Sequence, residues 1–178
     1  MKRTALALSV GVAVALVGCG DHARSVSIAH GALTLYDHEV RIQHSGAPDA
    51  RITAGGVLRI GSDEVALTGE QKATASAYYD AAMALPGLGL DTGKAGVAVG
   101  AAAIKEVASG LAKGDTSQID KNIEAKADAV KQSALKICAD LVTIRAAQDS
   151  LAASLAAFRP YAVLTSEEVD SCAKDMKN

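Results

Sequence analysis

The stretch from Ser117 to Phe158 constrains the fold most strongly, because its apolar residues recur with the period of one long helix. Steps of four and three residues alternate and place one stripe on one face: Ile123, Ala127, Val130, Ala134, Ile137, Leu141, Ile144, Gln148, Leu151, Leu155 and Phe158. Gln148 is the one polar member, and no Gly or Pro interrupts the stretch before Pro160. Helical propensity alone stabilises such a helix weakly, so the stripe must be buried against other parts of the chain.

Residues 26–67 alternate between apolar and polar in short runs, as strands with one buried face do. The runs, separated in part by Gly-rich turns, are Val26 to His30, Leu33 to Leu35, Val40 to His44, Ala50 to Ala54, Leu58 to Ile60 and Val65 to Leu67. The alternate positions of these runs, which would point to the other face of the sheet, hold polar residues: Arg41, Gln43, Arg51, Thr53 and Arg59. We therefore expect a small antiparallel meander whose apolar face a helix must cover, since so small a sheet is not stable alone.

Two matches to the capping-box pattern predict helix starts, at Thr68-Gly69-Glu70-Gln71 and at Thr165-Ser166-Glu167-Glu168. The first helix should end near Leu85, before Pro86-Gly87. Residues 88–114 are rich in Gly and Ala, and a helix break is expected at Gly114–Ser117. We interpret the Gly/Ala stretch as a helix packed tightly on the long one. The alternative, a glycine zipper in a bilayer, is disfavoured because its uncharged run of ten residues spans only about 15 Å.

The expected fold class is α+β: a small antiparallel β-meander followed by an Ala-rich antiparallel helical layer with one long helix. Hydrophobic residues make up 49% of the chain but aromatic residues only 3%, so the core should be modest in size. We expect a lipoprotein signal peptide at 1–18, a tether at 19–25 and a single domain at 26–178. Within this domain, residues 26–67 form the meander and residues 68–178 are helical.

Residues 1–18 have the layout of a secretory leader. Two basic residues precede an apolar run (Ala5 to Val17) that is too short for a permanent membrane helix. The small residues before Cys19 resemble the bacterial lipobox, which implies a diacylglycerol on the Cys19 sulfur and an acylated amine. Such a lipid anchor is stable. Gly20, rather than Asp, follows the cysteine, and by resemblance to the sorting rules of enteric bacteria this implies the outer membrane. The alternative is an ordinary signal peptide followed by a chance cysteine.

Cys138 and Cys172 each lie at the centre of an apolar patch. Leu135 and Val142 flank Cys138 beside the main stripe, and Cys172 lies on the only apolar face of the C-terminal helix. In an oxidising compartment these patches favour a Cys138–Cys172 disulfide that docks the last helix. Lipidation of Cys19 would leave an even number of cysteines. The alternatives are two free buried thiols, or a Cys19–Cys138 pair if no lipid is added.

Two segments carry a resemblance to a known family. They are Ile52-Thr53-Ala54-Gly55-Gly56-Val57 with Gly61, Val65-Ala66-Leu67, Gln71 and Tyr79, and Lys136-Ile137-Cys138-Ala139-Asp140-Leu141-Val142. Together they resemble the YggN-like envelope proteins, domain-of-unknown-function family 2884. The chain departs from that family in being shorter through the middle and in having a lipobox. The resemblance implies an envelope location and brings no activity or catalytic residue. A Cys soon after the leader could pair with the helix Cys in that family, which keeps the Cys19 alternative open.

Four histidines fall within one N-terminal stretch: His22, His30, His38 and His44. His30 and His44 share parity with apolar strand residues, so a zinc or copper site is conceivable. No close His-x-x-x-His or Cys-x-x-Cys pair accompanies them, so we interpret them as structural and expect no metal and no other cofactor. No nucleophile-elbow, triad or phosphate-binding glycine motif is present either, so we expect no enzyme and no catalytic or cofactor-binding residue.

Charge and leader together predict the partners. The formal charge is −2, and loss of Lys2 and Arg3 with the leader makes it −4, which argues against nucleic acid. We expect attachment to a membrane through the N-terminal lipid anchor, a cell-envelope location at the outer membrane facing the periplasm, and an envelope protein partner. The leading hypothesis is a noncatalytic envelope lipoprotein that binds a protein or helps to maintain the envelope. The alternative is a periplasmic small-ligand or metal-binding module.

Overall fold

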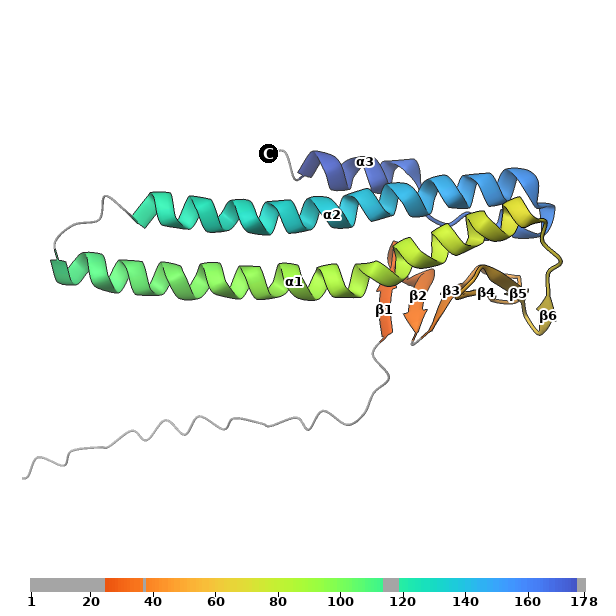
Figure 1. The fold of residues 1–178 in the computed structure, drawn as a ribbon, viewed down its shortest axis with the longest axis horizontal. Helices are drawn as coiled ribbons and strands as arrows, with labels where there is room; N and C mark the ends of the chain where they lie inside the picture. The colour runs from red at the N-terminus through yellow and green to blue at the C-terminus, as the bar shows by residue number, and fades with distance from the viewer. Residues whose placement is uncertain (1–24, 37, 114–118, 176–178) are drawn as a thin grey trace, which may run out of the picture.

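The structure, a computed structural model, describes residues 25–36, 38–113 and 119–175. Within them a six-stranded antiparallel sheet precedes the α-helices, and Figure 1 shows the sheet beside one end of a long helical hairpin. The expected α+β class is confirmed. The signal peptide, Cys19, the tether up to residue 24 and the predicted break at Gly114–Ser117 lie outside the described residues.

The strands follow one another across the sheet in chain order. They are β1 (Ser25–Ile28), β2 (Leu33–Tyr36), β3 (Glu39–Ile42), β4 (Ala50–Thr53), β5 (Val57–Ile60) and β6 (Asp63–Glu64). Successive side chains of a strand point to opposite faces. The buried strand residues all belong to the predicted apolar parity: Leu33, Leu35, Val40, Ile42, Ala50, Ile52 and Leu58. The meander and its inward face are therefore as predicted.

The ends of the predicted strands differ from the observed ones. His30 lies in a short 3₁₀ helix, Ala29–Gly31, rather than in a strand, and its φ is 54°. His44 follows β3 and is exposed. Val65 lies beyond β6, where its N–H donates to the Leu58 carbonyl at 2.9 Å. An apolar–polar alternation that matches the buried face of the sheet does not by itself place a residue in a strand. The alternation can continue for a residue or two after the chain has left the sheet.

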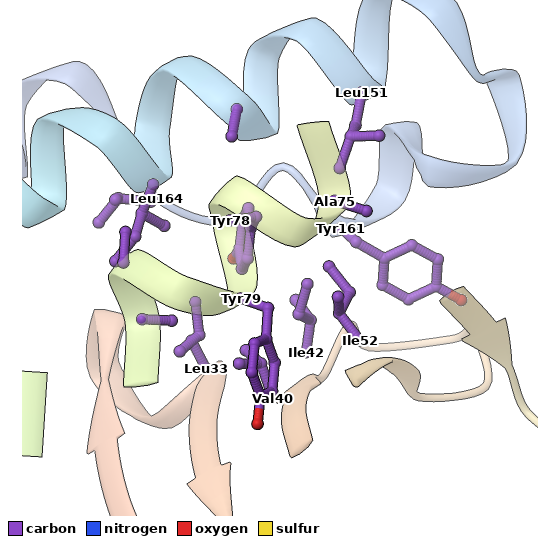
Figure 2. Close-up of a cluster of buried hydrophobic side chains, with 14 of the residues drawn as sticks. Leu33, Val40, Ile42, Ile52, Ala75, Tyr78, Tyr79, Leu151, Tyr161 and Leu164 are labelled. Carbon is purple, nitrogen blue, oxygen red and sulfur yellow. The ribbon is translucent and has the colours of Figure 1, made fainter. Parts of the chain in front are cut away.

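The first part of α1 (Gly69–Lys113) covers the apolar face of the sheet. It begins at the predicted capping box, where the Thr68 N–H donates to Gln71 Oε1 at 3.0 Å and the Gln71 N–H donates to Thr68 Oγ1 at 3.2 Å. Figure 2 shows the resulting cluster of buried side chains, among them Leu33, Val40, Ile42, Ile52, Ala75, Tyr78, Tyr79, Leu151, Tyr161 and Leu164. Each large side chain buried there contributes about 1.5–3 kcal/mol, so this cluster joins sheet and helices.

The α1 helix continues through Pro86, so the predicted end near Leu85 is wrong. A proline inside a helix lacks one N–H donor and costs about 3 kcal/mol. Figure 1 shows α1 changing direction between its yellow and green parts. Prolines commonly cause such kinks, and Pro86 is the proline inside α1. The same view shows α2 (Ile119–Ser154) beside α1 on both sides of this bend. Packing against α2 offsets the cost of the proline and keeps α1 continuous.

The predicted long helix is α2, and its stripe becomes more buried toward the C-terminal end. Ile137 and Leu141 are partly buried, whereas Ile144 and Leu151 are fully buried. The helix ends at Ser154, so the prediction that it reaches Phe158 is wrong. The buried Phe158 side chain belongs instead to a 3₁₀ helix, Ala156–Tyr161, that turns the chain back over the core.

The polar member of the stripe, Gln148, is only 1% exposed. Its Nε2 donates to the Leu164 carbonyl at 2.9 Å, and its Oε1 accepts from the Leu164 N–H at 2.9 Å. Both backbone groups of Leu164 are thus satisfied by one side chain, as a neighbouring strand would satisfy them. Gln148 therefore fixes the segment between the 3₁₀ helix and α3 (Ser166–Asp175) to α2.

The two long helices extend beyond the sheet as a hairpin (Figure 1). Among the described residues, none of α1 after Leu85 and none of α2 before Ile137 belongs to the apolar core or packs against it. We call residues 86–113 of α1 together with residues 119–136 of α2 the helical arm. Because the described residues of the arm lie outside the apolar core, the surface of the arm is of particular interest.

Candidate functional site

The predicted cysteine pair lies between α2 and α3. The sulfur atoms of Cys138 and Cys172 are 2.00 Å apart and the Cα atoms 5.7 Å apart, consistent with a disulfide bond. For a sequence separation of 34 the chain-entropy model gives a stabilisation of about 3.5–4 kcal/mol. Val142 of the same predicted patch stays 52% exposed, so α3 covers that patch only in part. Cys19, the predicted lipidation site, lies outside the described residues.

The first turn of α3 carries a carboxylate with several partners. Glu168 Oε2 accepts from the Thr165 hydroxyl at 2.7 Å and from the Thr165 N–H at 2.8 Å, which confirms the predicted capping box. Its Oε1 lies 3.2 Å from His30 Nδ1. The bonds from Thr165, followed by the nearby His30, hold the pKa of Glu168 below its ordinary value. These residues line an open depression of about 530 Å³.

The predicted histidines do not converge within the described part of the chain. His30 lies at the β1–β2 end of the sheet beside α3, whereas His38 lies in the β2–β3 turn at the opposite end. His44 is exposed in the β3–β4 loop, and His22 lies outside the described residues. Among those residues no three His, Cys, Asp or Glu side chains are grouped so as to hold a metal ion.

The outer face of the sheet carries a row of three arginines. Arg41 is the direct cross-strand partner of Arg51, which is in turn the partner of Arg59. Like charges placed directly opposite each other are destabilising. Glu39 Oε1 lies 3.1 Å from Arg41 Nη2 and 3.9 Å from Arg51 Nε, and Glu64 Oε2 lies 3.4 Å from Arg59 Nη2. Asp49 is the third carboxylate, with its Oδ2 4.0 Å from Arg41 Nε. Three carboxylates thus balance the three arginines, so we interpret the row as the solvated face of the sheet.

The arm exposes large apolar side chains on α1. Leu90, Val97 and Ile104 are 58%, 74% and 75% exposed. They are seven residues apart, and because seven residues make nearly two helical turns, they lie on one face. The partly buried residues of α1 on the side opposite to Val97 mark the side of α2: Leu88, Thr92, Ala95, Val99, Ala102 and Glu106. The apolar row, as we call these three residues, therefore faces away from α2.

Glycines run along one side of the apolar row. We call Gly89, Gly93, Gly96 and Gly100 the glycine row, and helical geometry places all of them within about 100° of Val97. A Cβ added at any of them would meet no atom within 4 Å. Each glycine costs about 1 kcal/mol relative to Ala inside a helix, and no contact of the described chain requires it. The predicted packing of the Gly/Ala stretch on the long helix is confirmed, but these glycines do not lie at that contact.

Charged residues border the apolar row on its other side. Lys94 and Lys105 follow this flank. Asp91 lies farther round the helix, at a depression that it shares with Lys136 and Asp140 of α2, and its Oδ1 lies 3.8 Å from Lys94 Nζ. The outer face of the arm thus carries small, large apolar and charged residues in three adjacent rows. No helix in the described ranges combines the length and the apolar character needed to cross a membrane. This face is suited to a contact with another surface.

Comparisons with family models, curated proteins and solved structures found no match to this chain. The resemblance to the YggN-like envelope proteins therefore stays a prediction. The apolar row was missed by the sequence reasoning, which took the Gly/Ala stretch as uniformly small. The signal that could have found it is the seven-residue spacing of large apolar residues along this face: Leu90, Val97, Ile104 and Leu111, of which the Leu111 side chain lies outside the described part of the chain.

Proposed function

We propose that this protein is a noncatalytic lipoprotein of the bacterial envelope that binds a protein partner through the outer face of its arm. The observation that carries this proposal is the apolar row, three large side chains exposed on a single helix face. Soluble proteins seldom leave apolar residues aligned on a surface unless that surface is covered by a partner or a membrane. The lipid on Cys19 holds the protein at the outer membrane, facing the periplasm.

Two further observations support an extracytoplasmic setting. The Cys138–Cys172 geometry is that of a disulfide, and disulfides persist in the periplasm and are rare in the bacterial cytosol. The leader at 1–18 has the secretory layout and ends directly before Cys19. Together they favour a domain that is exported, oxidised and then retained at a membrane.

The anchor is tested with Cys19→Ala in the full chain. Radiolabelled palmitate should label the wild-type protein and not the variant, and the variant should leave the membrane fraction. Intact mass of the native protein reports acylation and the disulfide together. Equal membrane partitioning of both chains, or a native mass without acyl groups, would refute the anchor.

Partner binding is tested with Val97→Glu, which puts a charge in the centre of the apolar row. The matched control is Val142→Glu, the same substitution at an exposed position of α2. Cross-linking in whole cells should capture a protein partner with the wild type and the control, and much less of it with Val97→Glu. Equal capture by all three chains would contradict a role for this face.

A small-ligand or metal-binding module is the second candidate. The observation that favours it is the open depression of about 530 Å³ beside α3, where His30 Nδ1 lies 3.2 Å from Glu168 Oε1. Metal analysis of protein purified without chelators separates the two candidates. Stoichiometric zinc or copper that disappears in His30→Ala would favour the module, whereas sub-stoichiometric metal would remove its metal version.

A further inference from the structure

We propose that the outer face of the sheet docks on the phosphate layer of the membrane that holds the lipid anchor. We call Tyr36, Arg41, Arg51 and Arg59 on this outer face the arginine face. The inference rests on the proposed function, because it takes the lipid on Cys19 as given. It goes beyond that function by stating which surface of the domain meets the membrane and through which side chains.

The length of chain between the anchor and the sheet limits how far the domain can lie from the membrane. Cys19 is six residues before Ser25, the first residue of β1. Six residues span at most about 20 Å, even when fully extended. β1 is an edge strand, and Tyr36 of β2 is the direct cross-strand partner of Ser25. The lipid surface therefore lies close to the corner of the sheet that carries Ser25 and Tyr36.

The outer face of the sheet is open to solvent beside this corner, whereas α1 and the apolar core cover the inner face. Figure 1 shows the arrow of β2 pointing away from α1, and β1 begins at the same end because the two strands are antiparallel. Neighbouring strands lie about 4.8 Å apart, so Arg41 on β3 and Arg59 on β5 are about 10 and 20 Å across the sheet from β1. The whole arginine face is thus within a tether length of the anchor.

The side chains of the arginine face suit the hydrated headgroup layer rather than the hydrocarbon. Arg41, Arg51 and Arg59 keep 34%, 38% and 51% of their side-chain surface exposed. Guanidinium groups bind phosphate through two parallel hydrogen bonds. Tyr36 is 38% exposed, with its ring centroid 5.9 Å from Arg41 Cζ, and tyrosine is enriched at the interface between membrane and water.

An open depression at the same end of the sheet gives a headgroup room beside Arg41. Its volume is about 350 Å³, and it is lined by Tyr36, His38, Glu39 and Thr53. Glu39 Oε1, which lies 3.1 Å from Arg41 Nη2, places the guanidinium at the border of this depression. A lipid phosphate that enters there meets the guanidinium and the aromatic ring together.

The tether makes a weak contact effective. Glu39, Asp49 and Glu64 balance the three arginines, so the arginine face has no charge excess that would draw the protein from solution. Ion pairs on a protein surface contribute little to stability, so a lipid phosphate can replace a carboxylate partner. A short flexible link raises the effective concentration of a second contact to about the millimolar range. Docking is therefore expected in the anchored chain.

A single tryptophan reports the docking, because the chain has none of its own. Tyr36→Trp is purified as the full chain from membranes, its acyl groups are checked by intact mass, and it is reconstituted in vesicles of phosphatidylethanolamine and phosphatidylglycerol. Nitroxide groups on the lipid headgroups should quench its fluorescence strongly. The matched Val142→Trp should be quenched little, since Figure 1 shows α1 between α2 and the strands β1 and β2. Equal quenching of both chains would overturn the inference.

Arg51→Glu, added to Tyr36→Trp, tests the arginines. Arg51 is the cross-strand partner of both Arg41 and Arg59, so a glutamate there exchanges two like-charge pairs for two opposite-charge pairs, and thermal unfolding should change little. The ratio of docked to undocked protein should fall about tenfold, because the charge facing the phosphates is reversed. The control Lys131→Glu makes the same change of charge at an exposed position of α2 and should leave the quenching unchanged. Quenching that persists in Arg51→Glu would overturn the inference.

The remaining outcomes separate this inference from the proposed function. An acylated chain whose Tyr36→Trp is not quenched would overturn the docking and leave the anchor and the arm's partner intact. Quenching of Val97→Trp without quenching of Tyr36→Trp would place the arm on the membrane and overturn the inference. Strong quenching of Tyr36→Trp in a chain that captures no protein would support the docking and count against partner binding. A native chain without acyl groups would refute the anchor and the docking together.

Discussion

The turn between β4 and β5 offers a matched pair of substitutions that tests how the sheet is held against α1. Gly55 and Gly56 are neighbours with nearly equal φ values of +75° and +74°. A Cβ added at Gly55 would meet nothing within 4 Å. A Cβ added at Gly56 would lie 2.1 Å from the Lys72 carbonyl oxygen and 2.9 Å from the Ser76 nitrogen, both backbone atoms of α1. The two positions share the backbone strain and differ only in the contact.

The magnitudes follow from those two terms. Alanine in the left-handed region costs about 1–2 kcal/mol, and this applies to both positions. At Gly56 the turn must also move away from α1 by more than about 1 Å to restore an ordinary contact distance. Forcing apart a packed interface in this way typically costs about 1–3 kcal/mol more. We therefore expect Gly55→Ala to lower the free energy of unfolding by about 1–2 kcal/mol and Gly56→Ala by about 2–5 kcal/mol.

Urea unfolding of the oxidised chain, followed by far-ultraviolet circular dichroism, measures both values in one experiment. The contact alone should separate the two variants by about 1–3 kcal/mol. In a thermal melt this difference should lower the melting temperature of Gly56→Ala by roughly 2–12 °C relative to Gly55→Ala. Equal destabilisation of the two variants within about 0.5 kcal/mol would refute the reasoning, because the contact with α1 is their only difference. A smaller loss in Gly56→Ala would refute it as well.

Three further predictions concern the core and the tail. Gln148→Met should lower the free energy of unfolding, measured in urea, by about 2–4 kcal/mol, because the two buried backbone groups of Leu164 lose their partners. The control is Gln132→Met at an exposed position of the same helix, which should change the free energy of unfolding by less than about 0.5 kcal/mol. Tyr161→Phe should lower the free energy of unfolding by about 1 kcal/mol in thermal unfolding, since the Tyr161 hydroxyl donates to the Pro48 carbonyl. Tyr78→Phe should be neutral or stabilising, because the buried Tyr78 hydroxyl has no partner among the described residues; burial also raises the pKa of Tyr78. Reduction of the disulfide should lower stability by about 2–4 kcal/mol and make α3 the first site of cleavage in limited proteolysis; an unchanged cleavage pattern would contradict its docking role.

The sheet was predictable because several local signals agreed. Parity, glycine turns and the polar opposite face all indicated the same meander, and each signal depends on residues within a few positions of one another. Both capping boxes were predictable for the same reason: the donor and acceptor are three residues apart, as at Thr68 and Gln71. The prediction of the cysteine pair also depended on an expected oxidising compartment, which we inferred from the layout of residues 1–18.

The continuation of α1 through Pro86 could not be predicted from local signals. A proline favours a helix end by about 3 kcal/mol, and only packing against a partner 50 residues away in the sequence outweighs that preference. The role of Gln148 was hidden in a similar way. A lone polar residue in an apolar stripe indicates that something must satisfy it, but its partner, Leu164, is defined only by how the chain turns back after α2.

The face that the arm presents to solvent was ambiguous for a different physical reason. A Gly/Ala helix is weakly apolar all round, so periodicity assigns no buried side, and α2 could have covered either the glycine row or its opposite face. In the structure α2 covers Thr92, Ala95 and Val99, leaving the glycines and the large residues outward. This arrangement leaves the intramolecular contact to ordinary residues, and no contact within residues 25–36, 38–113 and 119–175 requires the four outward glycines. For this reason we place the proposed function on the arm rather than on the sheet or the histidines.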